Sequence, residues 1–165
     1  MQWKRMLRHM LSDQRSLRRA FPRAALRAIR DQIGEQEKRH GGELRFAVEA
    51  SLPLLRLWHR QDARSRAVEL FGTLRVWDTE HNSGVLIYLL LADKRVEIVA
   101  DRGINSKVGA AAWEAICGEM QRSFAAGRFE QGVTLGVAAV SDLLAAHYPP
   151  VAARANELPN EPVVL

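Results

Sequence analysis

Oxygen-bearing side chains gather in the segment 77–84, WDTEHNSG, directly before a run of apolar residues. Asp78, Glu80 and Asn82 lie in this segment, and Asp101 follows about twenty residues later. Carboxylate and amide oxygens are the ligands that calcium and magnesium prefer, whereas zinc favours nitrogen and sulfur. The residue types therefore predict a calcium or magnesium site made of Asp78, Glu80, Asn82 and Asp101.

A β-hairpin would bring Asp101 back to the segment 77–84. Residues 85–91 are nearly all apolar, which predicts a central strand covered on both faces. Residues 93–94, Asp-Lys, predict a turn, and the alternation over 95–100 predicts an antiparallel return strand. The residue after the return strand then lies beside the residues before the first one.

Two interpretations of this cluster remain open. In the first, a bound cation polarises a phosphoryl oxygen, Arg102 holds the negative charge, and Asp101 or Glu80 positions the attacking water. No nucleophile with an adjacent base accompanies these residues, which weighs against catalysis. In the second, acids and amides before a strand form an ordinary solvated loop, and Asp101 pairs locally with Arg102.

Other catalytic and binding motifs are missing from the sequence. Residues 40–42, His-Gly-Gly, are similar to the oxyanion loop of some esterases, but no G-x-S-x-G segment supplies a nucleophile. No G-x-G-x-x-G or P-loop segment offers a phosphate cradle. Cys117 lies among apolar residues of a predicted helix, which is typical of a buried thiol. The histidines lack metal-ligand spacing, so zinc is not expected.

The composition is that of a soluble globular domain. The chain has 165 residues, of which 47% are hydrophobic and 26% charged, which excludes a disordered chain, a collagen-like fibre and a small disulfide scaffold. No stretch approaches the ~18 apolar residues of a membrane span, and no secretory signal is expected. A single cysteine fits a reducing compartment. We therefore expect a cytoplasmic protein, either free or peripheral at the membrane.

Positive charge is concentrated at the N-terminus. Residues 1–30 hold nine Lys or Arg and one acid, a net charge of +8, whereas the other residues hold 15 basic and 18 acidic side chains. Within residues 1–19, apolar side chains repeat at helical spacing among the basic ones: Trp3, Met6, Leu7, Met10 and Leu11. The pattern predicts a basic amphipathic helix, which Ser12 and Asp13 could interrupt and restart.

Such a helix suits an anionic membrane surface or a protein partner, through residues Met1 to Arg19. The alternative is a helix whose apolar stripe packs on its own core and whose basic face is solvated. Nucleic acid is not expected as a partner, because no nucleic-acid-binding fold or aromatic stacking surface accompanies the charges. We expect the fold to survive deletion of residues 1–19. The sequence does not determine the oligomeric state.

The predicted elements favour the α/β class, as a three-layer α/β/α sandwich with a small mixed central sheet flanked by helices. Besides the hairpin, periodicity predicts helices over 22–40, 62–74, 107–125 and 129–147 and a strand over 43–50. The chain then divides into three parts: a basic amphipathic helix over 1–20, an α/β domain over 21–148 and an extended, proline-containing tail over 149–165.

Residues 82–90, NSGVLIYLL, combine a loop containing Asn and Gly with an apolar strand, and residues 92–98, ADKRVEI, combine a turn containing Asp and Arg with an alternating strand. Residues 124–132, FAAGRFEQG, follow the pattern aromatic-x-x-Gly-x-aromatic-x-x-Gly at a predicted helix junction. These three segments resemble the TPM domain family, whose members are often labelled TPM phosphatase. The resemblance covers about residues 22–147.

The resemblance implies a sheet flanked by helices, divalent cation binding at a loop cluster, phosphatase activity and association with membrane complexes. Asn105 and Gly109 stand where the family has acids, so we expect calcium or magnesium to bind weakly. We therefore expect a non-catalytic TPM-like module that acts by contact with a protein partner or membrane surface. The alternative is a metal-assisted phosphatase that acts on phosphate esters.

Overall fold

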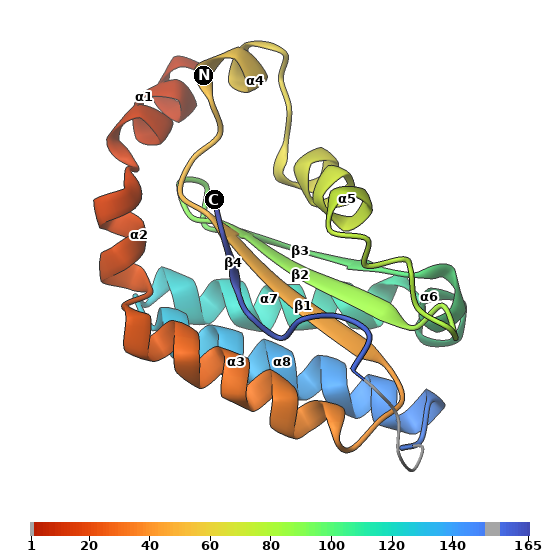
Figure 1. Ribbon diagram of the computed structural model, residues 1–165. Coiled ribbons are helices and arrows are strands. Elements are labelled where there is room, and N and C mark those ends of the chain that lie inside the picture. The colour runs from red at the N-terminus through yellow and green to blue at the C-terminus, as the bar shows by residue number, and fades with distance from the viewer. Residues whose placement is uncertain (1, 151–155) are drawn as a thin grey trace.

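The structure is a computed structural model that describes residues 2–150 and 156–165. Four strands form one mixed sheet in the order β3-β2-β1-β4 (Figure 1). They are β1 (Glu43–Glu49), β2 (Gly84–Leu90), β3 (Arg95–Ala100) and β4 (Val163–Val164). β1 runs parallel to both β2 and β4, and β3 runs antiparallel to β2. The predicted small mixed sheet is therefore confirmed.

Helices cover both faces of this sheet. α3 (Arg23–Glu37), α7 (Ala110–Ala125) and α8 (Phe129–His147) lie on one face, and α5 (Ala63–Thr73) lies on the other (Figure 1). Every residue of the central strands β1 and β2 is consequently buried. The arrangement confirms the predicted three-layer α/β/α sandwich.

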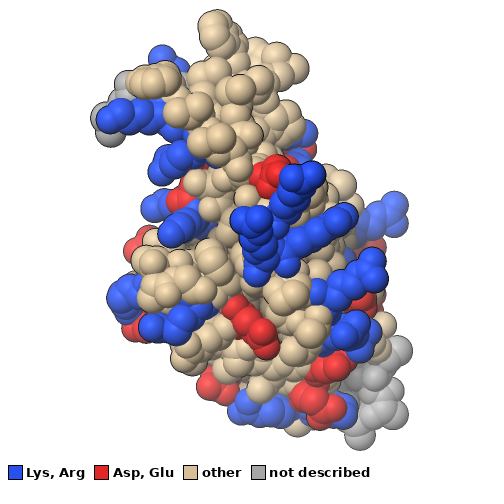
Figure 2. Space-filling model, turned by 90° about the vertical axis from the view of Figure 1, so that its left-hand side faces the viewer, with Lys and Arg blue, Asp and Glu red and all other residues tan. Residues whose placement is uncertain are grey.

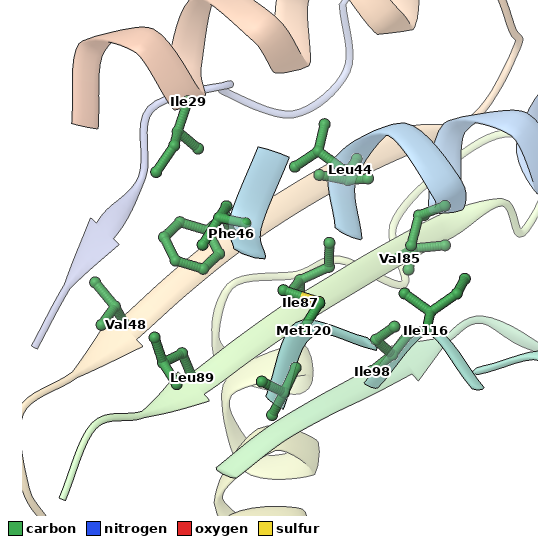
Figure 3. Close-up of a cluster of buried hydrophobic side chains, with 14 of the residues drawn as sticks. Ile29, Leu44, Phe46, Val48, Val85, Ile87, Leu89, Ile98, Ile116 and Met120 are labelled. Atoms are coloured by element: carbon green, nitrogen blue, oxygen red, sulfur yellow. The ribbon is translucent and has the colours of Figure 1, made fainter. Parts of the chain in front are cut away.

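The hydrophobic core divides into two clusters, one on each face of the sheet. Ile29 of α3, Phe46 of β1 and Met120 of α7 belong to the larger cluster and are at most 1% exposed (Figure 3). Ile87 enters this cluster, whereas its neighbour Leu86 enters the smaller cluster on the α5 side. Successive side chains of a strand point to opposite faces, so β2 contributes to both clusters.

β2 and β3 form the predicted hairpin. Val85 pairs with Ala100 at one end of the ladder, and Leu90 pairs with Arg95 at the other. Lys94 in the connecting turn has φ 48°, the left-handed conformation that tight hairpin turns use. The antiparallel pairing inferred from the apolar run and the alternating run is therefore confirmed.

α7 and α8 pack closely at Gly132 and Gly136, two glycines of α8 that lie four residues apart. A Cβ atom at Gly132 would lie 2.5 Å from the ring of Phe124, and one at Gly136 would collide with the sulfur of Met120. Phe124 and Met120 are both fully buried. Their side chains fill the space that the two glycines leave open.

Two helical regions differ from the sequence prediction. The single helix predicted over 107–125 is wrong at its start, because α6 (Arg102–Val108) and α7 are separate helices. Gly109 between them has φ 82°, a conformation that glycine adopts without strain and that ends α6. A short helix, α4 (Leu54–Trp58), follows Pro53, in a segment for which the sequence analysis predicts no helix. Proline is compatible with a helix start, since the first turn leaves its N–H groups unpaired.

The N-terminal segment forms two helices, α1 (Gln2–Leu11) and α2 (Gln14–Ala20). Asp13 precedes α2 and accepts a hydrogen bond from the N–H of Ser16 at 2.9 Å, which is the N-cap expected there. Leu17 of α2 is 1% exposed and packs in the larger cluster. Deletion of residues 1–19 would remove Leu17 from the core, and the expectation that the fold survives this deletion stays a prediction.

The C-terminal segment returns to the sheet edge. The backbone N–H groups of Glu157 and Leu158 donate to the carboxylate of Glu43, each at 3.2 Å. The described residues after Pro150 contain no helix, and β4 pairs with β1 beyond them. Residues 151–155 of the predicted extended tail lie outside the described residues. None of the described helices is both long and apolar enough to cross a membrane.

Candidate functional site

Asp101 lies where the hairpin brings the chain back to the start of β2. Its N–H donates to the carbonyl oxygen of Gly84 at 2.9 Å, so the predicted proximity of these segments is confirmed. Its Oδ1 accepts a hydrogen bond from the N–H of Arg102 at 2.6 Å and caps α6. Its Oδ2 is buried and accepts no hydrogen bond from the residues that the structure describes. One carboxylate oxygen is therefore available to another ligand.

Asn82 lies beside α6 at the same end of the sheet. Its carbonyl oxygen accepts a hydrogen bond from the N–H of Ile104 at 3.2 Å. Gly103 packs against that oxygen so closely that a Cβ atom would lie 2.5 Å from it. The structure thus brings the backbone of Asn82 and the start of α6, which Asp101 caps, to one place.

Asp78 and Glu80 lie in an exposed turn before β2. The N–H of Asp78 donates to the carbonyl oxygen of Arg75 at 3.0 Å, and the N–H of Glu80 donates to the Glu157 carboxylate at 2.9 Å. Within the described residues, no three His, Cys, Asp or Glu side chains come close enough together to hold a metal ion. The structure therefore does not gather the three predicted carboxylates into one group.

α1 offers a second candidate site, and its polar face is the one that contacts the rest of the protein. His9 is 3% exposed, and its Nδ1 accepts a hydrogen bond from the N–H of Leu52 at 2.9 Å. Since Nδ1 is the acceptor, Nε2 carries the ring proton, and it lies 3.3 Å from Oδ1 of Asp93. Arg5, one turn earlier on the same face, donates its Nε–H to Oδ2 of Asp93 at 2.8 Å.

Asp93 is thus the anchor of α1, a role that the sequence analysis missed. Burial opposes its ionisation, but hydrogen bonds from His9 and Arg5 and the charge of Arg5 outweigh that effect and lower the pKa of Asp93. Arg8 also pairs with it, at 3.2 Å. The sequence did contain a signal for this role. Asp93 is an acid in the turn between two predicted strands, and the N-terminus of the chain is strongly basic.

The apolar face of α1 points away from the protein. Four large apolar side chains on this face are between 43% and 72% exposed: Trp3, Leu7, Met10 and Leu11. Met6 at the edge of the stripe is partly buried against the smaller cluster. Figure 2 views the face that carries α1 and α2 and shows Lys and Arg side chains gathered below a largely uncharged end of the molecule. α1 therefore exposes its apolar face to solvent, whereas a helix packed on a core buries that face.

Comparison with known proteins identifies the domain. The family model of the TPM domain matches residues 17–143. The chain belongs to the TPM domain family. Among solved structures, it is similar to the BA42 protein of the psychrophilic bacterium Bizionia argentinensis, with a TM-score of 0.76 and 31% identity over 86% of this chain and 93% of that one. Curated protein sequences gave no match.

A second solved structure shares the fold. The N-terminal domain of a P. gingivalis protein matches with a TM-score of 0.59 and 19% identity, over 72% of this chain and 74% of that one. At this identity the likeness concerns the fold alone. Membership in the family confirms the resemblance seen in the hairpin and helix-junction segments.

Asn105 and Gly109 of this TPM domain have structural roles. Asn105 Oδ1 accepts a hydrogen bond from the indole N–H of Trp113 at 3.1 Å, and Gly109 forms the break between α6 and α7. Calcium takes 6–8 oxygen ligands, and a tight site needs several carboxylates. The described cluster supplies Oδ2 of Asp101 as its one buried, unpaired carboxylate oxygen. These residues do not fit a tight cation site, and the expectation that calcium or magnesium binds weakly stays a prediction centred on Asp101.

Proposed function

We propose that this protein is a non-catalytic TPM-domain module that docks on an anionic membrane surface through residues 1–19. The observation that supports the proposal is the orientation of α1. Its polar face, with Arg5 and His9, is held against Asp93, while Trp3 and Leu7 are exposed to solvent. An amphipathic helix held in this way presents its apolar side to whatever the protein meets.

The charges around α1 favour an anionic surface over a neutral one. Arg15, Arg18 and Arg19 of α2 are exposed. A groove of about 590 Å³ between this segment and the β2–β3 turn is lined by Arg8, Arg19 and Lys94, without an acidic residue among those that line it. Each Lys or Arg near an anionic lipid surface contributes about 1 kcal/mol to binding.

A lipid surface uses both features of this segment, the charges and the apolar stripe. Nucleic acid would engage the arginines but would leave the exposed side chains of Trp3, Met10 and Leu11 in water. A protein partner with an acidic, apolar groove is the remaining possibility, and the binding experiment below separates it from a membrane.

The phosphatase alternative receives less support from the arrangement of its candidate residues. Glu80 and Arg102 are exposed, and Asp101 caps α6 with one of its oxygens. The thiol of Cys117 is not an activated nucleophile either, because burial raises its pKa to about 11. A docking role therefore accounts for more of the described surface than a catalytic one.

Vesicle sedimentation tests the proposal. The intact protein should bind phosphatidylcholine vesicles that contain phosphatidylserine and should bind pure phosphatidylcholine vesicles far more weakly. Leu7→Gln with Met10→Gln should reduce binding roughly tenfold or more, because two large apolar side chains no longer enter the interface. Leu135→Gln is the matched control, since Leu135 is a comparably exposed apolar residue of α8, at 47%.

Two results would refute the proposal. One is absence of binding to vesicles of either composition, which would leave the surface to a protein partner. The other is an equal loss of binding for the α1 variant and the Leu135→Gln control, which would make the effect independent of α1.

A further inference from the structure

α4 has the same reversed orientation as α1. Leu54, Leu55 and Trp58 of this five-residue helix are 48%, 70% and 73% exposed. Leu57 on its other side is 2% exposed and packs in the smaller cluster. The helix thus uses one leucine as an anchor and leaves three large apolar side chains in water.

Ion pairs fix α4 in this orientation. Arg56 donates from its two terminal nitrogens to the two carboxylate oxygens of Glu69 in α5, at 2.6 and 3.0 Å. This hydrogen bonding from Arg56, together with the hydrogen bond of Gln61 and the charge of Arg66, lowers the pKa of Glu69 to about 2 although desolvation opposes the shift. Arg66 also binds the buried carboxylate of Glu49, at 2.8 and 3.2 Å. The polar side of α4 is therefore tied to α5 and, through it, to the sheet.

α1 and α4 are neighbours, and hydrogen bonds connect α1 to the residues on either side of α4. They lie side by side at one end of the molecule (Figure 1). His9 accepts a hydrogen bond from the N–H of Leu52, just before α4. Arg5 donates a hydrogen bond to the carbonyl oxygen of Gln61, just after α4, at 3.1 Å. The inward face of α1 thus holds both ends of the segment that contains α4. The outward faces of the two helices belong to one end of the protein.

We propose that α1 and α4 form a single two-helix membrane-insertion surface, in which α4 places Leu55 and Trp58 among the lipids of an anionic bilayer. The inference rests on the proposed function and adds a second element to it. Of the eleven large apolar side chains that are exposed in the described residues, seven belong to these two helices. They make up the two-helix surface: Trp3, Leu7, Met10, Leu11, Leu54, Leu55 and Trp58.

Charge complementarity identifies an anionic bilayer as the partner. The segments 1–12 and 50–61 contain no Asp or Glu, whereas Lys4, Arg8 and Arg60 are exposed beside the apolar residues. Tryptophan is enriched at membrane interfaces, where its ring enters the apolar region while its N–H stays near the headgroups. Two short helices with apolar outward faces and basic flanks can therefore lie in the interface without crossing the bilayer.

The test compares an α4 variant with controls in the full chain. Leu55→Gln with Trp58→Gln should weaken binding to phosphatidylcholine vesicles containing phosphatidylserine roughly tenfold or more, since each large apolar side chain that enters an apolar phase contributes at least that factor. Trp77→Gln is the matched control, because Trp77 is 51% exposed in the turn before β2. Thermal unfolding of each variant checks that the fold is retained, and Leu55→Gln alone is the milder variant if the double substitution fails to fold.

Fluorescence gives a second measurement that does not depend on affinity. Brominated lipids quench tryptophans that enter the bilayer, so bound wild-type protein should be quenched strongly. Trp58→Phe should remove a clear part of the quenched emission, whereas Trp77→Phe should leave the quenched emission unchanged and so raise the quenched fraction of the total. Quenching that persists unaltered in Trp58→Phe would show that α4 stays out of the lipid.

The outcomes separate this inference from the function on which it rests. If wild-type protein binds and the Leu7/Met10 variant loses binding while the Leu55/Trp58 variant equals wild type, the inference about α4 is wrong and the proposed function stands. If wild-type protein binds no vesicles, both fall. Equal losses in the α4 variant and in Trp77→Gln would also overturn the inference, because the effect would not be specific to α4.

Discussion

Replacement of Asp93 by Asn should release α1 from the protein while leaving the sheet folded. Asp93 receives three cationic or hydrogen-bonding groups from one helix: Arg5 at 2.8 Å, Arg8 at 3.2 Å and His9 at 3.3 Å. Its side chain is only 10% exposed, so the substitution leaves Arg5 and His9 facing a neutral amide in a partly buried position. α1 depends on this one residue more than on apolar packing, because most of its apolar side chains face solvent.

The size of the effect follows from the burial of the partners. Removal of one member of a buried ion pair costs about 3–5 kcal/mol, whereas an exposed pair contributes about 0–1 kcal/mol. The side chains of Arg5 and Arg8 are 24% and 60% exposed, which places the cluster between these limits. We expect Asp93→Asn to weaken the docking of α1 by about 2–3 kcal/mol, which raises the fraction of open α1 roughly 30- to 150-fold.

The lowered pKa of Asp93 fixes the pH dependence of this anchor. A carboxyl group whose folded-state pKa is lowered stabilises the folded form above its unfolded pKa of 3.8, and the stabilisation is lost as the pH falls through the lower folded-state value. The wild-type anchor should therefore persist at neutral pH and weaken only below about pH 4. Asp93→Asn should lack this acid transition.

Hydrogen exchange measures the release directly. Amides of α1 should exchange faster in Asp93→Asn by the factor given above, while those of β1 and β2 stay protected. Asp142→Asn is the control, since Asp142 binds Arg39 at 2.9 Å in a pair whose side chains are 64% and 52% exposed. Unchanged exchange over α1 would refute the anchoring role, and an equal change in the control would show that it is not specific.

Three further predictions concern the remaining sites. Calcium should bind with a dissociation constant on the order of 10⁻⁴ M or weaker, so about 1 mM calcium should raise the thermal midpoint of unfolding by no more than roughly 3–5 °C. Asp101→Asn should abolish this shift. A wild-type midpoint that calcium leaves unchanged argues against the site. Gly84→Ala should lower the free energy of unfolding by about 1–3 kcal/mol or more, because the added Cβ would collide with the carbonyl oxygen of Val76. Gly72→Ala, in open space on α5, should raise the free energy of unfolding by about 0.5–1 kcal/mol, and thermal unfolding measures both changes. Cys117 is partly buried, and desolvation raises the pKa of its thiol to about 11. It should be alkylated at pH 8 far more slowly than a free thiol, and rapid alkylation of the folded protein would contradict the raised pKa.

The central fold could be predicted from sequence because its signals are local. The apolar run of β2, the turn at Asp93 and Lys94 and the alternation of β3 each extend over a few residues, and together they define an antiparallel hairpin. The same hairpin brings Asp101 beside Gly84, as expected. The α6–α7 break was not predicted, since Gly109 within a helical pattern does not reveal that its φ is 82°.

The candidate cation cluster could be predicted only in part. Topology correctly brought the residue after β3 to the start of β2, but it did not determine the path of the turn before β2. That turn leaves Asp78 and Glu80 exposed, and its course depends on distant contacts such as the Glu157 carboxylate, which binds the N–H of Glu80. Pairing of the C-terminal β4 with β1 likewise has no local signal, because the two strands are more than a hundred residues apart.

The sequence by itself determined that residues 1–19 form helix with an apolar stripe and a basic face, since helical periodicity is a property of neighbouring residues. It could not determine which face turns inward. Tertiary structure decided that, because a single acid in the β2–β3 turn, Asp93, attracts Arg5 and His9 at close range. The electrostatic contact turns the apolar stripe toward solvent and places it beside α4. Long-range pairing of a few charges, which periodicity does not encode, thus decides which surface this TPM domain presents.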